Sequence, residues 1–250
     1  MSGYLFDYVL HLADDVLILG HRNSEWCGHG PVLEQDIAIT NISLDLIGQA
    51  RNFYQYAAEI QGNGASEDTL AYLRDVREFK NCLLVEQQNG DWGKTVLRQF
   101  FISNFHQLLY THLEKSADKA LAGICEKALK EVNYHLKWSS EWVIRLGDGT
   151  DESHARMLKA IDELWTYTGE LFLPTPYESE SFNTGIAPDI RTLEEAWLAR
   201  VCLVFDEATL PVPPKGFSQT GGKQGMHSEY LGFILAEMQY LQRTYPGSKW

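Results

Sequence analysis

The chain of 250 residues carries 34 acidic and 21 basic residues, which gives a formal net charge of −13. This charge repels phosphate backbones and anionic lipid, so we expect no nucleic acid and no membrane surface as partner. No apolar run reaches the roughly 18 residues needed to span a bilayer. The 4 cysteines lie far apart and form no CxxC pair, as is typical of a reduced, cytoplasmic protein.

The hydrophobic pattern predicts helices from the start of the chain. Apolar residues recur three to four positions apart from residue 4 to residue 20, and Gly20 is expected to end this first helix. The longest predicted helix runs from Pro31 to Glu59, with Gly62 and Gly64 after it. Gly48 in its middle costs about 1 kcal/mol relative to alanine, so we expect a close helix crossing or a void beside it.

The later helices are predicted from their caps and from glycines. Ser66 is a capping residue for a third helix that reaches about Val85. Further helices are expected at about 92–115, 117–146, 151–171, 192–208 and 227–245. The irregular stretches 173–189 and 210–226 are either surface connections or clamps around a partner chain. Without a linker or a repeat, the sequence predicts a single all-α domain over residues 1–250.

Helices this long are typical of a ferritin-like bundle, whose usual chemistry is a carboxylate-bridged di-iron centre. Such a centre needs a glutamate from each of two helices and a Glu-x-x-His motif from each of two others. No glutamate of this sequence has a histidine three residues later. Asp151 and His154 have the spacing, but they follow a turn at a helix start, where aspartate is an ordinary cap. A complete di-iron site is therefore not expected in this chain.

Other polar residues allow a functional and a structural interpretation. His21, Cys27 and His29 share one loop and could bind zinc, although no fourth ligand lies nearby. His106 and His135 lie on apolar helix faces and are expected to be hydrogen-bonded core histidines. The segment TGGKQG at 220–225 lacks the Walker spacing, and is either an anion site or the lead-in to a helix.

Three stretches of the chain match one known family. They are WCGHGPVLEQDIAITNISLDLIGQARNFYQYAAE at 26–59, KEVNYHLKWSSEWVIRLGDGTD at 130–151 and TGGKQGMHSEYLGFILAEMQYLQR at 220–243. In sequence and order they resemble the non-catalytic structural subunit (PaaC, also called PaaI) of bacterial phenylacetyl-CoA epoxidase, or phenylacetate-CoA oxygenase. The resemblance covers essentially the whole chain.

The resemblance implies that this chain is a degenerate copy of a di-iron sister subunit with the same ferritin-like fold. The first Glu-x-x-His of the sister falls on Leu46 to Gln49, and the second falls on Val132 to His135. Asp15 corresponds to a glutamate ligand of the sister's first helix. We expect Gln49, His135 and Asp15 to form a hydrogen-bonded layer inside the bundle.

A shift of the alignment by one residue would place acidic side chains at the vacant positions instead. Asp45 or Glu131 would then stand where the sister has its carboxylate ligands. In that case the chain would be a di-iron or di-manganese oxidase in its own right, with irregular ligands. A third interpretation is a free-standing helical binding protein without a catalytic partner.

By resemblance, the function is to scaffold the catalytic subunit of a multicomponent monooxygenase that forms the ring 1,2-epoxide of phenylacetyl-CoA. This chain is then expected to contain no metal, and the partner to hold the di-iron centre. A reductase with FAD, an iron-sulfur cluster and NADPH supplies electrons. The expected assembly is a heterodimer that doubles to a heterotetramer. Lys215 and Lys223 in the last long loop are the candidates for contact with a partner or with a coenzyme A phosphate.

Overall fold

The computed structural model describes residues 2–248, and within this range it contains helices and no strand. The α-helices are α1 (Ser2–Ser24), α2 (Leu33–Gln61), α3 (Glu67–Tyr72), α4 (Leu83–Glu86), α5 (Trp92–Leu113), α6 (Lys119–Gly147), α7 (Asp151–Leu164), α8 (Pro176–Asn183), α9 (Leu193–Glu207), α10 (Glu229–Met238) and α11 (Tyr240–Thr244). The 3-10 turns are η1 (Val76–Glu78), η2 (Trp165–Tyr167), η3 (Gly169–Phe172), η4 (Ile190–Thr192) and η5 (Gly222–Gln224).

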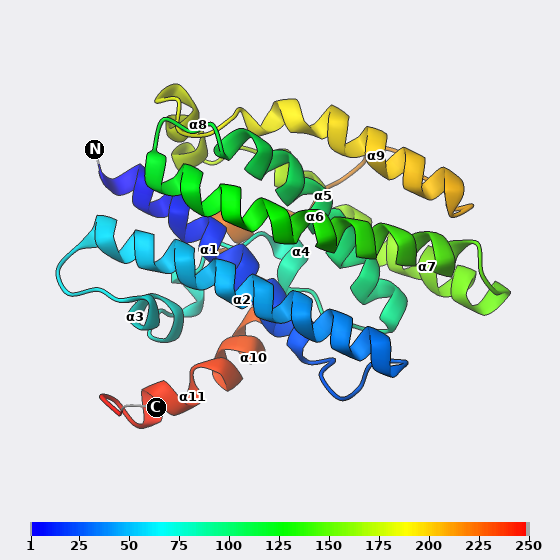
Figure 1. Ribbon diagram of the computed structural model, residues 1–250, viewed down its shortest axis with the longest axis horizontal. Coiled ribbons are helices and arrows are strands. Elements are labelled where there is room, and N and C mark those ends of the chain that lie inside the picture. The colour runs from blue at the N-terminus through cyan, green and yellow to red at the C-terminus, as the bar shows by residue number, and fades with distance from the viewer. Residues whose placement is uncertain (1, 249–250) are drawn as a thin grey trace.

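Four long helices, α1, α2, α5 and α6, form the central bundle (Figure 1). Helix α1 packs along α2, α5 packs along α6, and α2 also contacts α6. Helices α7 and α9 pack against α5 and α6, and α9 follows the upper edge of the view in Figure 1. Helices α10 and α11 lie at the opposite edge, below the bundle. The prediction of an all-α helical bundle is confirmed.

Helix α2 agrees with the sequence prediction to within two residues at each end. It begins after Val32, so Pro31 lies just outside the first turn, where Glu34 and Asp36 favour the helix dipole. It ends where Gly62 adopts φ 68°, a conformation that favours glycine. Gly48 faces open space, because nothing lies within 4 Å of the position a Cβ would occupy. Of the two alternatives expected at Gly48, a close helix crossing or a void, the crossing is not made within residues 2–248 and the open space agrees with the second.

The prediction that Gly20 ends the first helix is wrong, because α1 continues to Ser24. Gly20 instead faces α2, where an added Cβ would lie 3.2 Å from Cγ1 of Ile47 and 3.3 Å from Cβ of Leu46. The missing side chain lets α1 and α2 approach closely. This contact brings α1 against the half of α2 that carries the candidate site residues.

The helix predicted from Ser66 to Val85 is also wrong beyond its first turns. Ser66 caps α3 as expected, but the chain leaves the helix at Leu73. The backbone N–H of Lys80 donates to Asp14 at 2.8 Å, and that of Cys82 donates to Asp15 at 2.7 Å. Carboxylates of α1 thus replace the helical carbonyl partners, and the segment crosses α1 in an irregular conformation.

The middle of the chain and α9 agree with prediction, while the rest of the last third deviates. Asp91 caps α5 and Asp118 caps α6. Helix α7 ends at Leu164 and continues as 3-10 turns to Phe172. The stretch 173–189 is not wholly irregular, because it contains α8. The final helix is divided at Gln239, whose side-chain amide donates to backbone oxygens of the α3–η1 region.

Candidate functional site

The predicted ligand positions on α2 and α6 face each other across the seam between these two helices. Nε2 of Gln49 donates to Oε2 of Glu131 at 2.9 Å. Nε2 of His135 lies 3.0 Å from Oδ2 of Asp45, within hydrogen-bond distance. Gln49 and His135 are therefore each bonded to an acidic residue of the opposite helix. The prediction that His135 is a hydrogen-bonded core histidine is confirmed.

Hydrocarbon fills the two positions where the sister subunit is expected to have carboxylates. Leu46 and Val132 are each 1% exposed and belong to the hydrophobic core. The acidic neighbours do not take their place, since Asp45 is about one-third exposed and is paired with His135. Glu131 is half-buried and accepts from Gln49. The one-residue shift that would make Asp45 and Glu131 central ligands thus finds no support in the geometry.

Asp15 is buried on α1 but belongs to a different polar group from the α2–α6 layer. Its Oδ1 accepts the backbone N–H of Cys82, and its Oδ2 lies 3.7 Å from Nε2 of His11. Burial raises the pKa of Asp15, although His11 and the Cys82 N–H oppose that rise. The side chain joins α1 to the irregular segment before α4. The expectation that Asp15 shares one hydrogen-bonded layer with Gln49 and His135 is not met.

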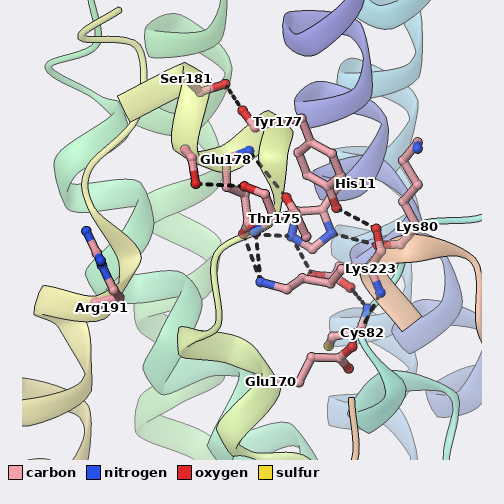
Figure 2. Close-up of polar contacts among 12 residues, drawn as sticks. His11, Lys80, Cys82, Glu170, Thr175, Tyr177, Glu178, Ser181, Arg191 and Lys223 are labelled. Atoms are coloured by element: carbon pink, nitrogen blue, oxygen red, sulfur yellow. Dashed lines mark hydrogen bonds and ion pairs between the residues drawn. The ribbon is translucent and has the colours of Figure 1, made fainter. Parts of the chain in front are cut away.

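Lys223 is buried against Glu178 rather than exposed to a ligand. Figure 2 shows its side chain extending from the loop 210–226, which we call the late loop, toward Glu178. In this view His11 lies above the side chain and Glu170 lies below it. Nζ of Lys223 lies 3.0 and 2.9 Å from the two carboxylate oxygens of Glu178. Burial alone would raise the pKa of Glu178, but Lys223 and His11 outweigh it and the pKa is lowered.

Glu170 fastens the late loop to the segment before α4. Its carboxylate accepts the backbone N–H of Leu83 and that of Gly221, each at 2.7 Å. Burial is the main reason that the pKa of Glu170 is raised. At Gly222 an added Cβ would lie 2.5 Å from the carbonyl oxygen of Asn81, so the two segments touch at the backbone. The motif TGGKQG therefore serves a close backbone contact and a buried ion pair, and Lys223 is not available to a phosphate.

The bundle centre also contains a group of polar aromatic residues on α1 and α5. His106 stacks on Tyr110 with a centroid distance of 5.1 Å and an interplanar angle of 9°. Burial lowers the pKa of His106 to about 3, so the ring is neutral near pH 7. The hydroxyls of Tyr8 and Tyr110 are buried and have no hydrogen-bond partner within residues 2–248. Neutral aromatic side chains thus pack together between α1 and α5 in the core.

The remaining candidate ligands are engaged in local contacts. Nδ1 of His154 lies 2.7 Å from the carbonyl oxygen of Gly147, while Asp151 begins α7. Nδ1 of His29 lies 3.2 Å from the carbonyl oxygen of Cys27 in an exposed turn. Within residues 2–248 no group of three or more His, Cys, Asp or Glu side chains is arranged to hold a metal ion.

Sequence reasoning missed the acidic residues that organise the buried polar groups. Asp14 accepts from Tyr54, from Arg74 and from the backbone of Lys80, and it is fully buried. Glu170 and Glu178 play similar parts in the last third of the chain. The available signal was the pair Asp14–Asp15 between the apolar residues Leu12–Ala13 and Val16–Leu19, because buried acids occur where partners are supplied.

Comparison with known proteins agrees with the three motifs. The family model described as phenylacetic acid catabolic protein matches residues 2–250. This chain belongs to that family. It is 53% identical over 243 residues to the C component of the 1,2-phenylacetyl-CoA epoxidase of Escherichia coli (strain K12), and the match covers 97% of this chain and 98% of the relative. The resemblance to the subunit family is confirmed.

No helix within residues 2–248 is long and apolar enough to cross a membrane.

Proposed function

We propose that this chain is the non-catalytic structural subunit of a 1,2-phenylacetyl-CoA epoxidase that acts in phenylacetate catabolism. The identity to the C component of such an epoxidase over nearly the whole length supports its place in a multi-subunit complex. The observation that carries the non-catalytic assignment is the α2–α6 seam. There Leu46 and Val132 are buried, while Gln49 and His135 are already bonded across the seam.

The two buried positions Leu46 and Val132 lack the charge that a pair of iron ions requires. Carboxylates supply negative charge and bridging oxygens in di-iron bundles, and leucine and valine supply neither. Nε2 of Gln49 and Nε2 of His135 already have partners, while Oε1 of Gln49 is buried and has no hydrogen-bond partner within residues 2–248. The two cross-helix bonds stabilise the bundle without a metal. We assign the di-iron centre to a partner catalytic subunit, and electron delivery to a reductase with FAD, an iron-sulfur cluster and NADPH.

The outer face of α2 supports a docking role. An apolar stripe along this face is exposed at helical spacing, and it consists of Leu33, Ile37, Leu44 and Ile47. Leu44 is 63% exposed, which is unusual for a leucine in the middle of a long helix of an acidic protein. Gly48 lies beside these residues with open space around it, so a foreign backbone can approach closely. We infer that a helix of the catalytic subunit packs on this stripe in a heterodimer, which then doubles to a heterotetramer.

Iron content tests the non-catalytic assignment. The chain purified alone is expected to contain no iron, whereas the complex with its catalytic partner contains about two irons per catalytic chain. Iron at about two per chain in the isolated protein would contradict the proposal. It would favour an oxidase that uses Asp45, Glu131 and His135.

A substitution on α2 tests the docking face. Burying the exposed part of Leu44 contributes about 2 kcal/mol, so Leu44→Glu is expected to lower affinity for the catalytic subunit by at least about 30-fold. Leu158→Glu on α7 is the matched control, since Leu158 is also exposed but lies outside the stripe. Titration by mass photometry measures both. Equal affinities for the two variants would exclude the α2 stripe as the interface, and a chain that binds no partner at all would favour a free-standing binding protein.

A further inference from the structure

A second apolar site lies at α9, away from the α2 stripe. A cavity of about 290 Å³ opens between α9, the 3-10 turns η2 and η3, and the loop 212–218. Figure 1 shows α9 and α2 at different edges of the bundle with α6 between them, and α6 contacts both. A partner bound at the α9 cavity therefore does not compete for the α2 stripe. We call this site the α9 pocket.

The floor of the α9 pocket is a preformed aromatic surface. Trp197 is buried at 2% exposure, and its ring centroid lies 5.4 Å from Phe172 and 6.0 Å from Trp165. Nε1 of Trp197 donates to the carbonyl oxygen of Phe101, which fixes the indole. Rings held in this way accept another ring by edge or offset contact without reorganisation.

The outer wall of the pocket is a stiff loop that carries an exposed aromatic residue. Pro213 and Pro214 restrict the backbone, and both line the cavity. The loop is attached to η2 where the N–H of Gln219 donates to the carbonyl oxygen of Thr166 at 2.8 Å. Phe217, which also lines the cavity, remains 78% exposed. The wall is thus preformed, yet its largest apolar side chain has no cover within residues 2–248.

The size and surroundings of the pocket favour a protein segment over a small molecule. A volume of about 290 Å³ accommodates one aromatic side chain and its neighbouring backbone, but not a nucleotide-sized ligand. Leu198 and Val212 also line the cavity, and both are partly exposed. A ligand small enough to enter would leave this rim and Phe217 in water, whereas a bound segment covers them.

The charged residues around the pocket indicate which residue types the bound segment carries. Asp162 and Glu194 line the cavity, and the basic residue among the lining side chains, Lys215, is bonded to Glu194 at 2.5 Å. Helix α9 also exposes Glu195, while its Arg200 turns inward to Asn104 and Gln107. Two carboxylates against one ammonium leave the lining with a net negative charge, and an aromatic floor with such a lining is complementary to an aromatic residue with basic neighbours.

We propose that the α9 pocket binds an aromatic side chain of another subunit of the complex, on a segment where lysine or arginine flanks that residue. This proposal rests on the proposed place of the chain in a multi-subunit complex. The pocket gives the chain a second docking face besides the α2 stripe. The chain then links two partners rather than supporting one.

Photo-crosslinking in the assembled complex tests this proposal. p-Benzoylphenylalanine replaces Phe217 in the chain, which is co-expressed with the other subunits, irradiated and analysed by peptide mass spectrometry. The expected product joins position 217 to a segment of another subunit with an aromatic residue within three positions of Lys or Arg. The same probe at Leu203 is the matched control, because Leu203 lies on α9 and is 72% exposed but does not line the pocket. It is expected not to label that segment.

A binding experiment separates the pocket from the α2 stripe. Leu198→Glu is expected to weaken binding of a synthetic peptide with the cross-linked sequence by at least about tenfold, while Leu203→Glu leaves it unchanged. Leu198→Glu should also leave copurification through the α2 stripe intact, and circular dichroism checks that both variants fold. Equal labelling from positions 217 and 203 would overturn the proposal, as would a cross-linked segment without aromatic and basic residues. A cross-link only to a second copy of this chain would also overturn it. So would the absence of a cross-link together with a bound small molecule in native mass spectrometry.

Discussion

Replacement of Lys223 by methionine tests the buried ion pair directly. Lys223→Met keeps the length and the packing of the side chain but leaves the Glu178 carboxylate buried without its ammonium partner. Removing one member of a buried pair costs about 3–5 kcal/mol. Because Glu178 also accepts the backbone N–H of Thr175 at 2.8 Å, we expect the lower end, about 3 kcal/mol. Urea denaturation at pH 7, followed by circular dichroism, measures this loss in the free energy of unfolding.

The pH dependence of the loss has a definite sign. Lys223 lowers the pKa of Glu178 in the folded protein below its unfolded value. The pair therefore stabilises the fold fully above the unfolded pKa of a glutamate, and this contribution is lost as the pH falls through the folded pKa. The difference in unfolding free energy between wild type and Lys223→Met should be largest near pH 7 and should become smaller below a pH of about 4. A gap that widens toward acid would contradict the assignment.

A matched control comes from the other lysine of the same late loop. Lys215 is 84% exposed and pairs with Glu194, so Lys215→Met is expected to change stability by less than about 1 kcal/mol. The double variant Lys223→Met with Glu178→Gln should recover part of the loss, because no buried charge is left unpaired. A cost for Lys223→Met as small as that for Lys215→Met would refute the buried-pair interpretation and would return Lys223 to the set of ligand-contact candidates.

Three further predictions concern the seam and two glycines. Gln49→Ala should lower the free energy of unfolding by about 1 kcal/mol, and His135→Ala should lower it by about 2–3 kcal/mol. Epoxidation by the assembled complex should be unchanged in both variants. A large loss of turnover in an intact complex would contradict the structural role. Gly222→Ala should lower the melting temperature because its Cβ has no room, whereas Gly232→Ala, with open space on α10, should not. Gly48→Ala should raise the stability of the isolated chain by about 1 kcal/mol yet weaken the complex, and a gain in both measurements would exclude a close crossing at this position.

The helices that were predicted well carry their own boundary signals. Asp91 and Asp118 cap α5 and α6, and Gly62 ends α2, so local residues set these limits. The helix prediction for 66–85 failed because backbone N–H groups of this segment donate hydrogen bonds to Asp14 and Asp15, which lie more than 60 positions earlier in the chain. A local pattern does not report partners at that distance, and tertiary contacts overrode the helix preference.

The candidate site could be predicted in its residues but not in its pairing. The family resemblance implied that Gln49 and His135 occupy former ligand positions and bond within the bundle, and the structure shows Nε2 of each bonded across the α2–α6 seam. It did not reveal that Glu131 and Asp45 are their partners, because that depends on the register of α2 against α6. The burial of Lys223 was not predictable from a lysine in a glycine-rich loop. It follows from the carboxylates of Glu170 and Glu178, which draw the loop into the core.

The clamp made by Glu170 has a consequence for biosynthesis. Its carboxylate holds Leu83 and Gly221 together, so residues from early and late in the chain meet at one buried point. During translation the central bundle can form while this point is still open, since Gly221 leaves the ribosome long after Leu83. Until then, Glu170 and the backbone around Leu83 lack partners. We therefore expect the nascent chain to be vulnerable to proteases until Gly221 has left the ribosome, and we expect its yield to depend on conditions that protect it during that interval.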